Sequence, residues 1–335
     1  MAVSIGEKII ARGYEPVVVA EIGNNHGGNE LLAEEMIRAA AAAGAELVKF
    51  QSCSVDRFLS PRSDCYDEFA AETLTFEAQA RLFSLATSLG LTAFSTPLDD
   101  AALDFLVRSG RKLLKIASGD LTNIPLLESA GRTGLPVLLS TGAGDLREIE
   151  KALLALDPDN RGQVVVMHCT VAYPARDKDA RLSMLEKLAK TFGYPVGLSD
   201  HTKGIDISLG AVALGAVVLE KHFTTDRRLP GGDNEMSILP HELAALITGV
   251  RRIWTAMYGR EEMTAEERNV RTAIRRSPAA MTDIAAGALL TRENLGILRP
   301  GVGLPPEKFE SLLGRRVLQN VEQGAAIDPS WLEDL

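Results

Sequence analysis

Short apolar runs alternate with segments of helical periodicity along the first 260 residues. Several of the helical segments start at Asp or Asn and end at Gly, which are common helix boundaries. Continuous apolar strands that alternate with helices are typical of a parallel sheet covered by helices. The eight apolar runs are residues 17–23, 46–51, 91–97, 113–118, 136–141, 164–170, 195–201 and 216–223. Eight such units predict an α/β fold, a (β/α)8 TIM barrel, rather than an open doubly wound sheet.

The pattern changes after a last long helical segment at residues 241–259. Residues 261–276 are rich in charge, and we interpret them as a linker. Residues 277–335 contain short β-like pieces, turns and one helix, which is typical of a small β-rich domain. The sequence therefore predicts a barrel domain at 1–260, the linker, and a separate small domain at 277–335.

Composition narrows the function further. The net charge of −9 and the lack of a basic helix face argue against a nucleic-acid partner. The three cysteines show no CxxC spacing, which indicates a reducing compartment. The N-terminus lacks the apolar core of a signal peptide, and no run reaches the roughly 20 apolar residues of a membrane span. We expect a cytoplasmic protein with no membrane partner.

Two of the five histidines lie at the carboxyl ends of the seventh and eighth predicted strands. These are His201 in "GLSDHT" and His222 in "LEKHFT". Neighbouring strands lie about 4.8 Å apart, so both imidazoles could bind one divalent cation at the carboxyl end of the barrel. Two nitrogen ligands suit Mn²⁺, Zn²⁺, Fe²⁺ or Co²⁺. The alternative is that each ring is a hydrogen-bonded barrel histidine.

Two lysines interrupt otherwise apolar strands. Lys49 and Lys115 fall in the second and fourth predicted strands, where a lysine binds phosphate or carboxylate, or forms a Schiff base. The alternative is a lysine that extends to the rim. Thr96, Ser118 and Ser199 could donate to the same anion. Together with a metal, this set indicates carbonyl chemistry on a phosphorylated small molecule.

At these residues the chain resembles the sialic acid synthase family, which condenses phosphoenolpyruvate with an amino-sugar aldehyde. The matching motifs run in order through both predicted domains. They include "AEIGNNHGG", "GAELVKFQ", "KIASGD", "GLSDHT", "LEKHFT", "PGGD" and "RPGVGLPP". The resemblance implies that the small domain is an antifreeze-like (SAF) domain and that the product is a nonulosonic acid, formed with release of phosphate by C–O cleavage.

The resemblance also implies roles for individual residues. His201 and His222 would bind the metal, for which we expect Mn²⁺, with Mg²⁺ or Co²⁺ as alternatives. The residues implied in catalysis are Glu21, Lys49, Lys115, His201 and His222. Those implied in substrate binding are Lys49, Thr96, Lys115, Ser118, Asp120, Tyr173, Ser199, Asp233 and Arg299. Arg299 would reach into the barrel of a second subunit, which implies a domain-swapped homodimer.

Three positions depart from the N-acetylneuraminate-forming members of this family. Asp120 stands in place of Glu, Val171 in place of Asn, and Ala273 in place of Phe. We therefore expect N-acetylmannosamine to be a poorer substrate than a 6-deoxy diamino sugar, and legionaminic, pseudaminic and spore-coat sugar acids stay open as products. A Schiff-base pyruvate aldolase is a remoter alternative, and a carbohydrate-binding or ice-binding protein is the non-enzymatic one.

Overall fold

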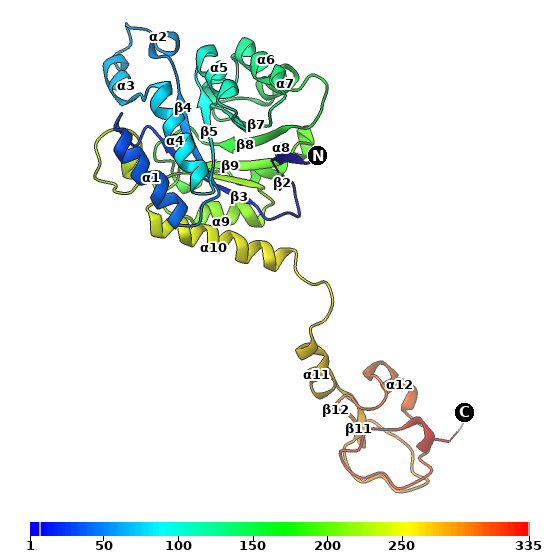
Figure 1. Cartoon of the computed structure of the whole chain (residues 1–335). Helices are drawn as coiled ribbons and strands as arrows, with labels where there is room; N and C mark the ends of the chain where they lie inside the picture. The colour runs from blue at the N-terminus through cyan, green and yellow to red at the C-terminus, as the bar shows by residue number, and fades with distance from the viewer. Residues whose placement is uncertain (7, 334–335) are drawn as a thin grey trace. The chain divides into compact units, whose positions relative to one another are not determined.

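The computed structural model describes residues 1–6 and 8–333. Contacts between Cα atoms divide the chain into two compact units, Met1–Gly259 and Arg260–Leu335 (Figure 1). Among the described residues, no helix combines the length and the hydropathy that crossing a membrane requires.

The first unit is a closed barrel of eight parallel strands, which confirms the predicted TIM barrel. Each strand pairs with the next one along the chain, and the last strand pairs with the first, which closes the barrel. Each predicted apolar run coincides with one strand to within about two residues at either end. The strands are β3 (Val17–Gly23), β4 (Leu47–Ser52), β5 (Thr92–Pro97), β6 (Leu114–Ile116), β7 (Val137–Ser140), β8 (Val164–Cys169), β9 (Val196–Asp200) and β10 (Val218–His222).

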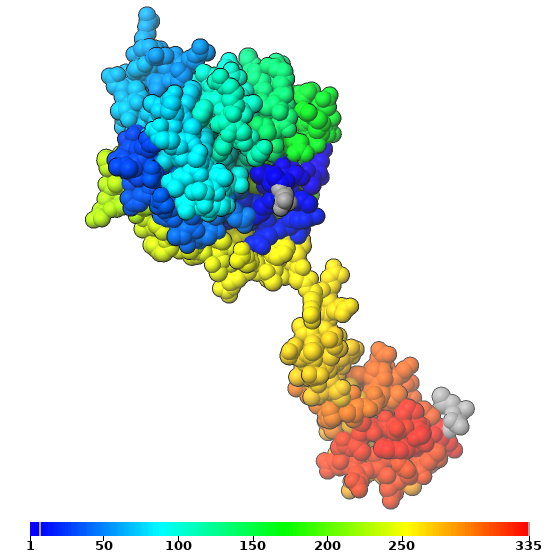
Figure 2. Space-filling view, viewed as in Figure 1, coloured from blue at the N-terminus to red at the C-terminus, as the bar shows by residue number. Residues whose placement is uncertain are grey.

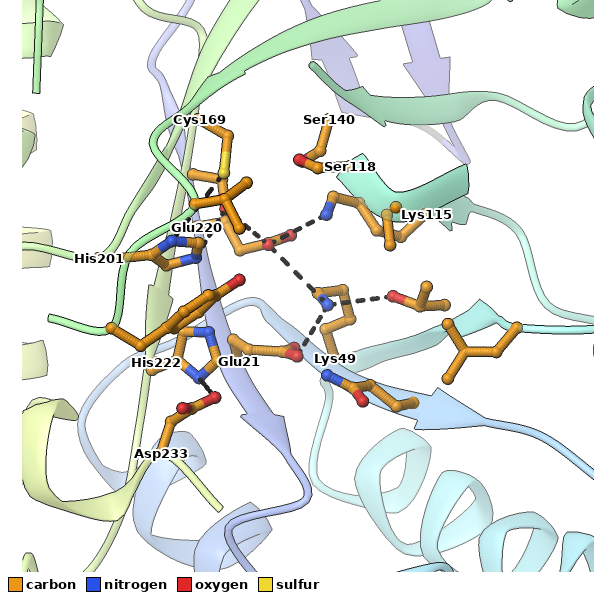
Figure 3. A pocket seen from close by; sticks show the side chains of 18 of the residues that line it. Glu21, Lys49, Lys115, Ser118, Ser140, Cys169, His201, Glu220, His222 and Asp233 are labelled. Atoms are coloured by element: carbon orange, nitrogen blue, oxygen red, sulfur yellow. Dashed lines mark hydrogen bonds and ion pairs between the residues drawn. The ribbon is translucent and has the colours of Figure 1, made fainter. Parts of the chain in front are cut away.

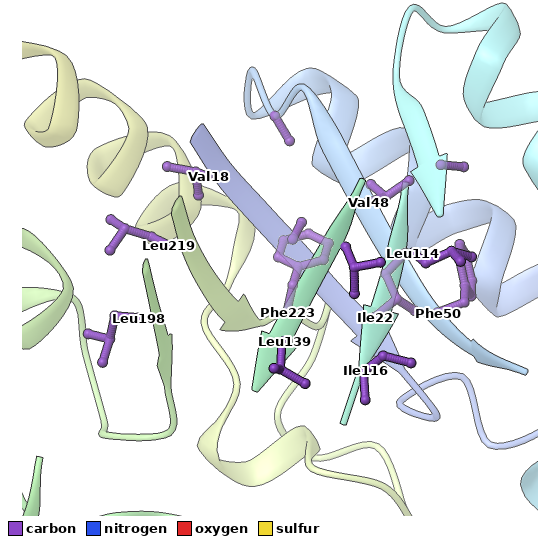
Figure 4. Close-up of a cluster of buried hydrophobic side chains, with 14 of the residues drawn as sticks. Val18, Ile22, Val48, Phe50, Leu114, Ile116, Leu139, Leu198, Leu219 and Phe223 are labelled. Carbon is purple, nitrogen blue, oxygen red and sulfur yellow. The ribbon is translucent and has the colours of Figure 1, made fainter. Parts of the chain in front are cut away.

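Alternating side chains on each strand face opposite sides of the barrel wall, as the period of two in a strand requires. One set, including Val18, Val48 and Leu219, packs outward against the helices in the largest hydrophobic cluster (Figure 4). The other set, including Val19 and Leu138, fills the barrel interior. Both faces of each strand are therefore buried, which explains why the runs are continuously apolar.

Helices surround the barrel, and five of them, α1, α4, α5, α6 and α7, begin at a residue whose side chain caps the helix. The longest, α10, packs against α9 and α1. Asp145 and Glu148 form a reciprocal capping box at the start of α7. The helices of this unit are α1 (Glu30–Ala42), α2 (Val55–Phe58), α3 (Tyr66–Glu72), α4 (Phe76–Ser88), α5 (Asp100–Arg108), α6 (Ile124–Arg132), α7 (Leu146–Leu156), α8 (Ser183–Phe192), α9 (Asp206–Ala213) and α10 (Pro240–Met257), with 3₁₀ turns η1 (Ser118–Asp120), η2 (Asp177–Asp179) and η3 (Asn234–Met236).

An antiparallel hairpin precedes the barrel and was not predicted. Its strands are β1 (Val3–Ile5) and β2 (Lys8–Ile10). Val3, Ile5 and Ile10 pack with the inward-facing residues near the amino ends of the barrel strands. The N-terminal residues form part of the surface of this unit (dark blue in Figure 2). The hairpin therefore covers the end of the barrel opposite the carboxyl ends of the strands.

The second unit is small and rich in turns. Strands β11 (Ser277–Ala280) and β12 (Leu295–Leu298) pair antiparallel, and single bridges such as Ile284 to Val321 extend the pairing. A separate hydrophobic cluster forms its core. The segment interpreted as a linker contains helix α11 (Ala265–Ile274), which starts at a capping box. The remaining elements are α12 (Phe309–Leu312), η4 (Pro306–Lys308) and η5 (Pro329–Trp331).

Candidate active site

A cavity of about 200 Å³ opens at the carboxyl ends of the barrel strands. Its walls come from all eight strands and the loops that follow them, as expected for the active end of a TIM barrel. Figure 3 shows the charged side chains of several strands pointing toward one another in this cavity. The residues that line it are Glu21, Lys49, Gln51, Phe58, Phe69, Thr96, Leu98, Lys115, Ala117, Ser118, Gly119, Ser140, Cys169, Val171, Tyr173, Ser199, His201, Glu220, His222 and Asp233.

Most of the predicted site residues meet in this cavity. Two do not line it. Asp120 lies on η1, where its carboxylate accepts a hydrogen bond from Asn123 Nδ2 at 3.0 Å, and Arg299 is an exposed residue of the second unit. The ten that line the cavity are Glu21, Lys49, Thr96, Lys115, Ser118, Tyr173, Ser199, His201, His222 and Asp233.

Two lysines and two carboxylates form the deepest part of the cavity. Lys49 Nζ lies 2.8 Å from Glu21 Oε1 and 3.8 Å from Glu220 Oε1, and it donates to Thr96 Oγ1 at 3.1 Å. Lys115 Nζ lies 3.2 Å from the same Glu220 oxygen. All four charged side chains are buried. The charges therefore compensate one another in a site shielded from water.

Burial and pairing shift these groups in opposite directions. Burial raises the pKa of Glu21 despite the nearby Lys49. Burial also opposes the ionisation of Glu220, but Lys115 and Lys49 outweigh it and lower its pKa. Two carboxylates in one cavity with pKa values driven apart are typical of a site where one carboxylate exchanges a proton and the other stays ionised.

Several buried polar atoms in the cavity lack a hydrogen-bond partner within the described residues. They are Glu21 Oε2, Ser140 Oγ, Glu220 Oε2 and His222 Nδ1. An unpaired buried polar atom costs free energy, commonly about 1–3 kcal/mol. Such a group at the wall of a cavity indicates a binding position for a polar ligand.

The two histidines face each other with ring centroids 5.2 Å apart. His201 Nδ1 donates to the Thr170 carbonyl oxygen at 2.8 Å. The lone pair is therefore on His201 Nε2, which lies 3.5 Å from Ser199 Oγ. His222 Nδ1 lies 3.4 Å from Asp233 Oδ2. Burial lowers the pKa of both rings. Both imidazoles are therefore held in the neutral form that binds metals.

These donors fit a divalent cation that is held only in part by protein. Two neutral ring nitrogens face the cavity, and one of them, His222 Nδ1, is buried and makes no hydrogen bond within the described residues. Within residues 1–6 and 8–333, no three His, Cys, Asp or Glu side chains converge closely enough to form a ligand set. The remaining coordination positions would fall to substrate and water, which is the open arrangement of catalytic rather than structural metal sites.

An ion pair behind the barrel wall fixes the strands that carry these histidines. Lys221 and Asp200 immediately precede His222 and His201, and both point outward. Lys221 Nζ donates to Asp200 Oδ2 at 2.9 Å and also to the Thr202 carbonyl. Lys221 is fully buried. The register of β9 and β10 is therefore tied at the level of the two rings.

Asn25 ties the loop after β3 to the loop after β10. Its Nδ2 donates to the Phe223 carbonyl and to Ser237 Oγ, both at 2.9 Å. Its Oδ1 accepts from the Asp233 backbone N–H at 2.8 Å. The Asn25 side chain is buried. This amide therefore holds Asp233 at the edge of the cavity beside His222.

Four further residues line the cavity although the sequence pattern predicted no role for them: Gln51, Ser140, Cys169 and Glu220. The period of two could have found Glu220. It lies two positions before His222 on the same strand, so both side chains must face the same side of the wall. The intervening Lys221 faces the opposite side.

Together, the paired lysines, the two carboxylates and the two histidines form a buried set of charged and polar groups of the kind found in enzyme active sites. The comparisons with known proteins agree with this class. The NeuB family matches residues 36–262, and the SAF domain matches residues 275–333. The chain belongs to the NeuB family and is an enzyme of the transferase class with a C-terminal SAF domain.

Named relatives cover nearly the whole chain. The N,N'-diacetyllegionaminic acid synthase of Legionella pneumophila is 36% identical over 92% of each chain. The N-acetylneuraminate-9-phosphate synthase of Mus musculus is 32% identical over 91% of this chain and 89% of that protein. The crystal structure of N-acetylneuraminic acid synthetase from Leptospira borgpetersenii, in complex with citrate, has a TM-score of 0.76 and 36% identity, and covers 80% of this chain and 94% of that one.

Proposed function

We propose that this enzyme condenses phosphoenolpyruvate with the open-chain aldehyde of an amino sugar, giving a nonulosonic acid and phosphate. The observation that carries the proposal is the pair of buried lysines, Lys49 and Lys115, beside the two neutral histidines at the barrel mouth. The relatives named as synthases of legionaminic and neuraminic acids support the same reaction class.

The lysines would bind the two acidic groups of phosphoenolpyruvate. In the free enzyme their charges are compensated by Glu21 and Glu220. Thr96, Ser118 and Ser199 supply hydroxyl donors to the same region. A buried cation is a strong partner for phosphate because the surroundings screen it weakly. This set would hold the substrate by its charges, with no lysine acting as a nucleophile.

His201 Nε2 and His222 Nδ1 are the atoms available to a divalent cation. We expect Mn²⁺, with Mg²⁺ or Co²⁺ as alternatives. When bound, such a cation would act as a Lewis acid on the sugar carbonyl. Asp233 and Tyr173, which flank the histidines, would orient the sugar beside the phosphoenolpyruvate.

The bond changes then follow from the positions of the carboxylates. The methylene carbon of phosphoenolpyruvate forms a C–C bond to the aldehyde carbon as the π bond of the aldehyde breaks, and the resulting alkoxide oxygen takes a proton from water. The positive charge left on the enol carbon is stabilised by carboxylate, for which Glu21 is the candidate. Water adds to that carbon and loses a proton to Glu21, whose raised pKa suits it as an acceptor. The new hydroxyl group gives its proton to the departing phosphate as the C–O bond breaks, which leaves the 2-keto acid.

We further infer from the family resemblance that the enzyme acts as a homodimer in which Arg299 contributes to the barrel of the partner. The loop that carries Arg299 is held firmly within its own unit. Gly301 N–H donates to the Thr272 carbonyl at 2.8 Å, and Gly303 N–H donates to Ser277 Oγ at 3.0 Å. A loop held in this way can present a charged side chain with little loss of conformational entropy.

Phosphate release tests the proposal. Purified enzyme with Mn²⁺, phosphoenolpyruvate and a panel of amino sugars should release phosphate only when both substrates are present, and chelator should stop the reaction. Borohydride added with pyruvate should leave the protein mass unchanged. A covalent pyruvyl adduct on a lysine would instead indicate a Schiff-base aldolase, and the absence of phosphate release with every sugar would refute the condensation.

A further inference from the structure

One buried ion pair lies on the outer side of the barrel wall, at the level of the two histidines. Lys221 of β10 and Asp200 of β9 stand opposite each other in the register of these strands, and their side chains are at most 2% exposed. Among the described residues, every other ion pair between two buried side chains lines the cavity. The pair of Lys221 and Asp200 does not, so substrate charge does not account for it.

Hydrogen bonds extend this pair into a network of four residues, Asp200, Thr202, Ser208 and Lys221, here called the outer network. Asp200 Oδ1 accepts from the N–H and the hydroxyl of Thr202 at 2.9 and 2.7 Å. Asp200 Oδ2 accepts from Ser208 Oγ of α9 at 2.5 Å and from Lys221 Nζ at 2.9 Å. Lys221 also donates to the Thr202 carbonyl oxygen. All four side chains are buried, and the carboxylate is fully hydrogen-bonded.

The outer network holds the chain on both sides of His201 and directly before His222. Asp200 and Thr202 flank His201 in the sequence, and Lys221 donates to both of them. Lys221 itself immediately precedes His222. Successive side chains of a strand face opposite sides of the sheet, so fixing Asp200 and Lys221 outside the wall fixes the direction of the two rings inside it.

Stability does not explain a charged pair in this place. The outward-facing residues that precede it on the same strands, Leu198 and Leu219, pack in the apolar cluster of the barrel and its helices. Apolar side chains at the next outward positions would continue that packing. Removing two charges from water costs free energy that their mutual attraction often does not recover, so an apolar pair of similar volume is commonly as stable or more stable. Contacts behind metal ligands, in contrast, orient those ligands.

We propose that the outer network positions the metal site: it sets the spacing and direction of His201 and His222, and its role is orientation rather than stability. Its four members are positioning residues, since none of them lines the cavity. The inference rests on the proposed function, because it concerns the affinity of the two histidines for a divalent cation.

The test neutralises the ion pair with side chains of similar shape. In the double variant Asp200→Asn/Lys221→Met, the amide oxygen still accepts from Thr202 and the amide nitrogen can donate to Ser208 Oγ, so no buried charge is left alone. The variant should unfold at the native Tm or above it. It should bind Mn²⁺ about 10–100-fold more weakly in calorimetry, the usual effect of losing a contact behind a metal ligand.

Two further measurements separate orientation from general damage. The paramagnetic resonance spectrum of the double variant at saturating Mn²⁺ should differ from that of the native enzyme, because it reports the symmetry of the ligands. The KM for phosphoenolpyruvate should stay unchanged, since Lys49 and Lys115 lie on β4 and β6. Ser208→Ala removes one hydrogen bond of the outer network and keeps the ion pair, so its Mn²⁺ affinity should lie between those of the native enzyme and the double variant.

Asp157→Asn is the matched control. Asp157 is also a buried carboxylate, and it accepts from the N–H groups of Arg161 and Gly162 at 2.8 Å and from Tyr194 Oη at 3.1 Å. It precedes β8, whereas the histidines lie at the carboxyl ends of their strands. Loss of its charge should lower the Tm and leave the Mn²⁺ affinity at the native value.

The possible failures are distinguishable. Native Mn²⁺ affinity in both the double variant and Ser208→Ala overturns the inference alone, because the native enzyme then binds the metal without help from the outer network. A double variant that unfolds well below the native Tm also overturns it, since the network would then be a stabilising element. Absence of Mn²⁺ binding by the native enzyme refutes the metal assignment of the proposed function and the inference with it.

Discussion

At the scale of single residues, Lys115 is the most direct test of the proposed anion site. Lys115→Met should raise the KM for phosphoenolpyruvate at least about 30-fold, because a buried charge partner is worth about 2–5 kcal/mol. Lys49→Met should raise the KM for phosphoenolpyruvate to a similar extent. Steady-state kinetics with phosphate release measures both effects.

Lys203→Met is the matched control for these variants. Lys203 is exposed and pairs with Glu235 at 3.5 Å, so its loss should leave the KM unchanged. Equal KM values for the Lys115, Lys49 and Lys203 variants would contradict the assignment of the anion site.

His26 gives a prediction about pH and stability at the same scale. Burial lowers its pKa from 6.5 to about 4, so the folded barrel keeps His26 neutral. The contribution of neutral His26 to the free energy of unfolding is complete above pH 6.5. It is lost as the pH falls from 6.5 toward 4, because the unfolded state binds a proton there that the folded state does not. It amounts to about 3 kcal/mol.

His26→Asn should make the apparent Tm less sensitive to pH between 6.5 and 4 than in the native protein. His241→Asn, which removes an exposed histidine at the start of α10, is the control and should keep the native pH dependence. If both variants show the native dependence of Tm on pH across this range, burial of neutral His26 does not contribute to stability.

At the scale of structural elements, Asn25 connects the loop after β3 to the loop that carries Asp233. Asn25→Ala should raise the KM for the sugar and leave the KM for phosphoenolpyruvate within about twofold, since the lysines lie on other strands. The control is Asn24→Ala, because no side-chain hydrogen bond is found for Asn24 in the described part of the chain. A parallel rise in both KM values would indicate general disruption instead of loss of Asp233 placement.

The elements also show what the sequence could and could not predict. The eight barrel strands were predicted because inward and outward side chains are both buried, which makes each run continuously apolar. Hairpin β1–β2 was missed because its strands have only three residues each. Helix α11 was missed because none of its residues is buried, so a charged surface pattern was interpreted as a linker.

The sequence likewise predicted only part of the site. The lysines and the histidines were found from their unusual place in or at the ends of apolar strands, and Glu21 from the family resemblance. Glu220 was not assigned because its role depends on pairing with Lys115 and Lys49 across the barrel, from β6 and β4. A list of strand ends does not contain such contacts, although the alternation along β10 does give the direction of the side chain.

At the scale of the whole molecule, the metal prediction concerns both histidines together. His201→Ala and His222→Ala should each remove most of the affinity for Mn²⁺, measured by calorimetry on the purified chain, while thermal unfolding shows that the barrel persists. His241→Asn should retain the native affinity. Unchanged Mn²⁺ affinity in both alanine variants would contradict the assignment.

The proposed dimer predicts complementation between two inactive chains. Arg299→Ala and His222→Ala should each have little activity alone, and a mixture with verified subunit exchange should regain part of it. In a mixed dimer, one intact barrel can receive one intact Arg299 loop. No recovery of activity would place the action of Arg299 within its own chain or outside the reaction.

The central claim is that the cavity joins phosphoenolpyruvate to a sugar aldehyde by C–O cleavage. Phosphoenolpyruvate labelled with ¹⁸O at the bridging oxygen tests it directly, with mass spectrometry of the released phosphate. Attack of water on the enol carbon, beside Glu21, predicts that the label leaves with the phosphate and that the keto oxygen of the product is unlabelled. Label retained in the keto acid would mean that the P–O bond breaks instead, and would contradict the account.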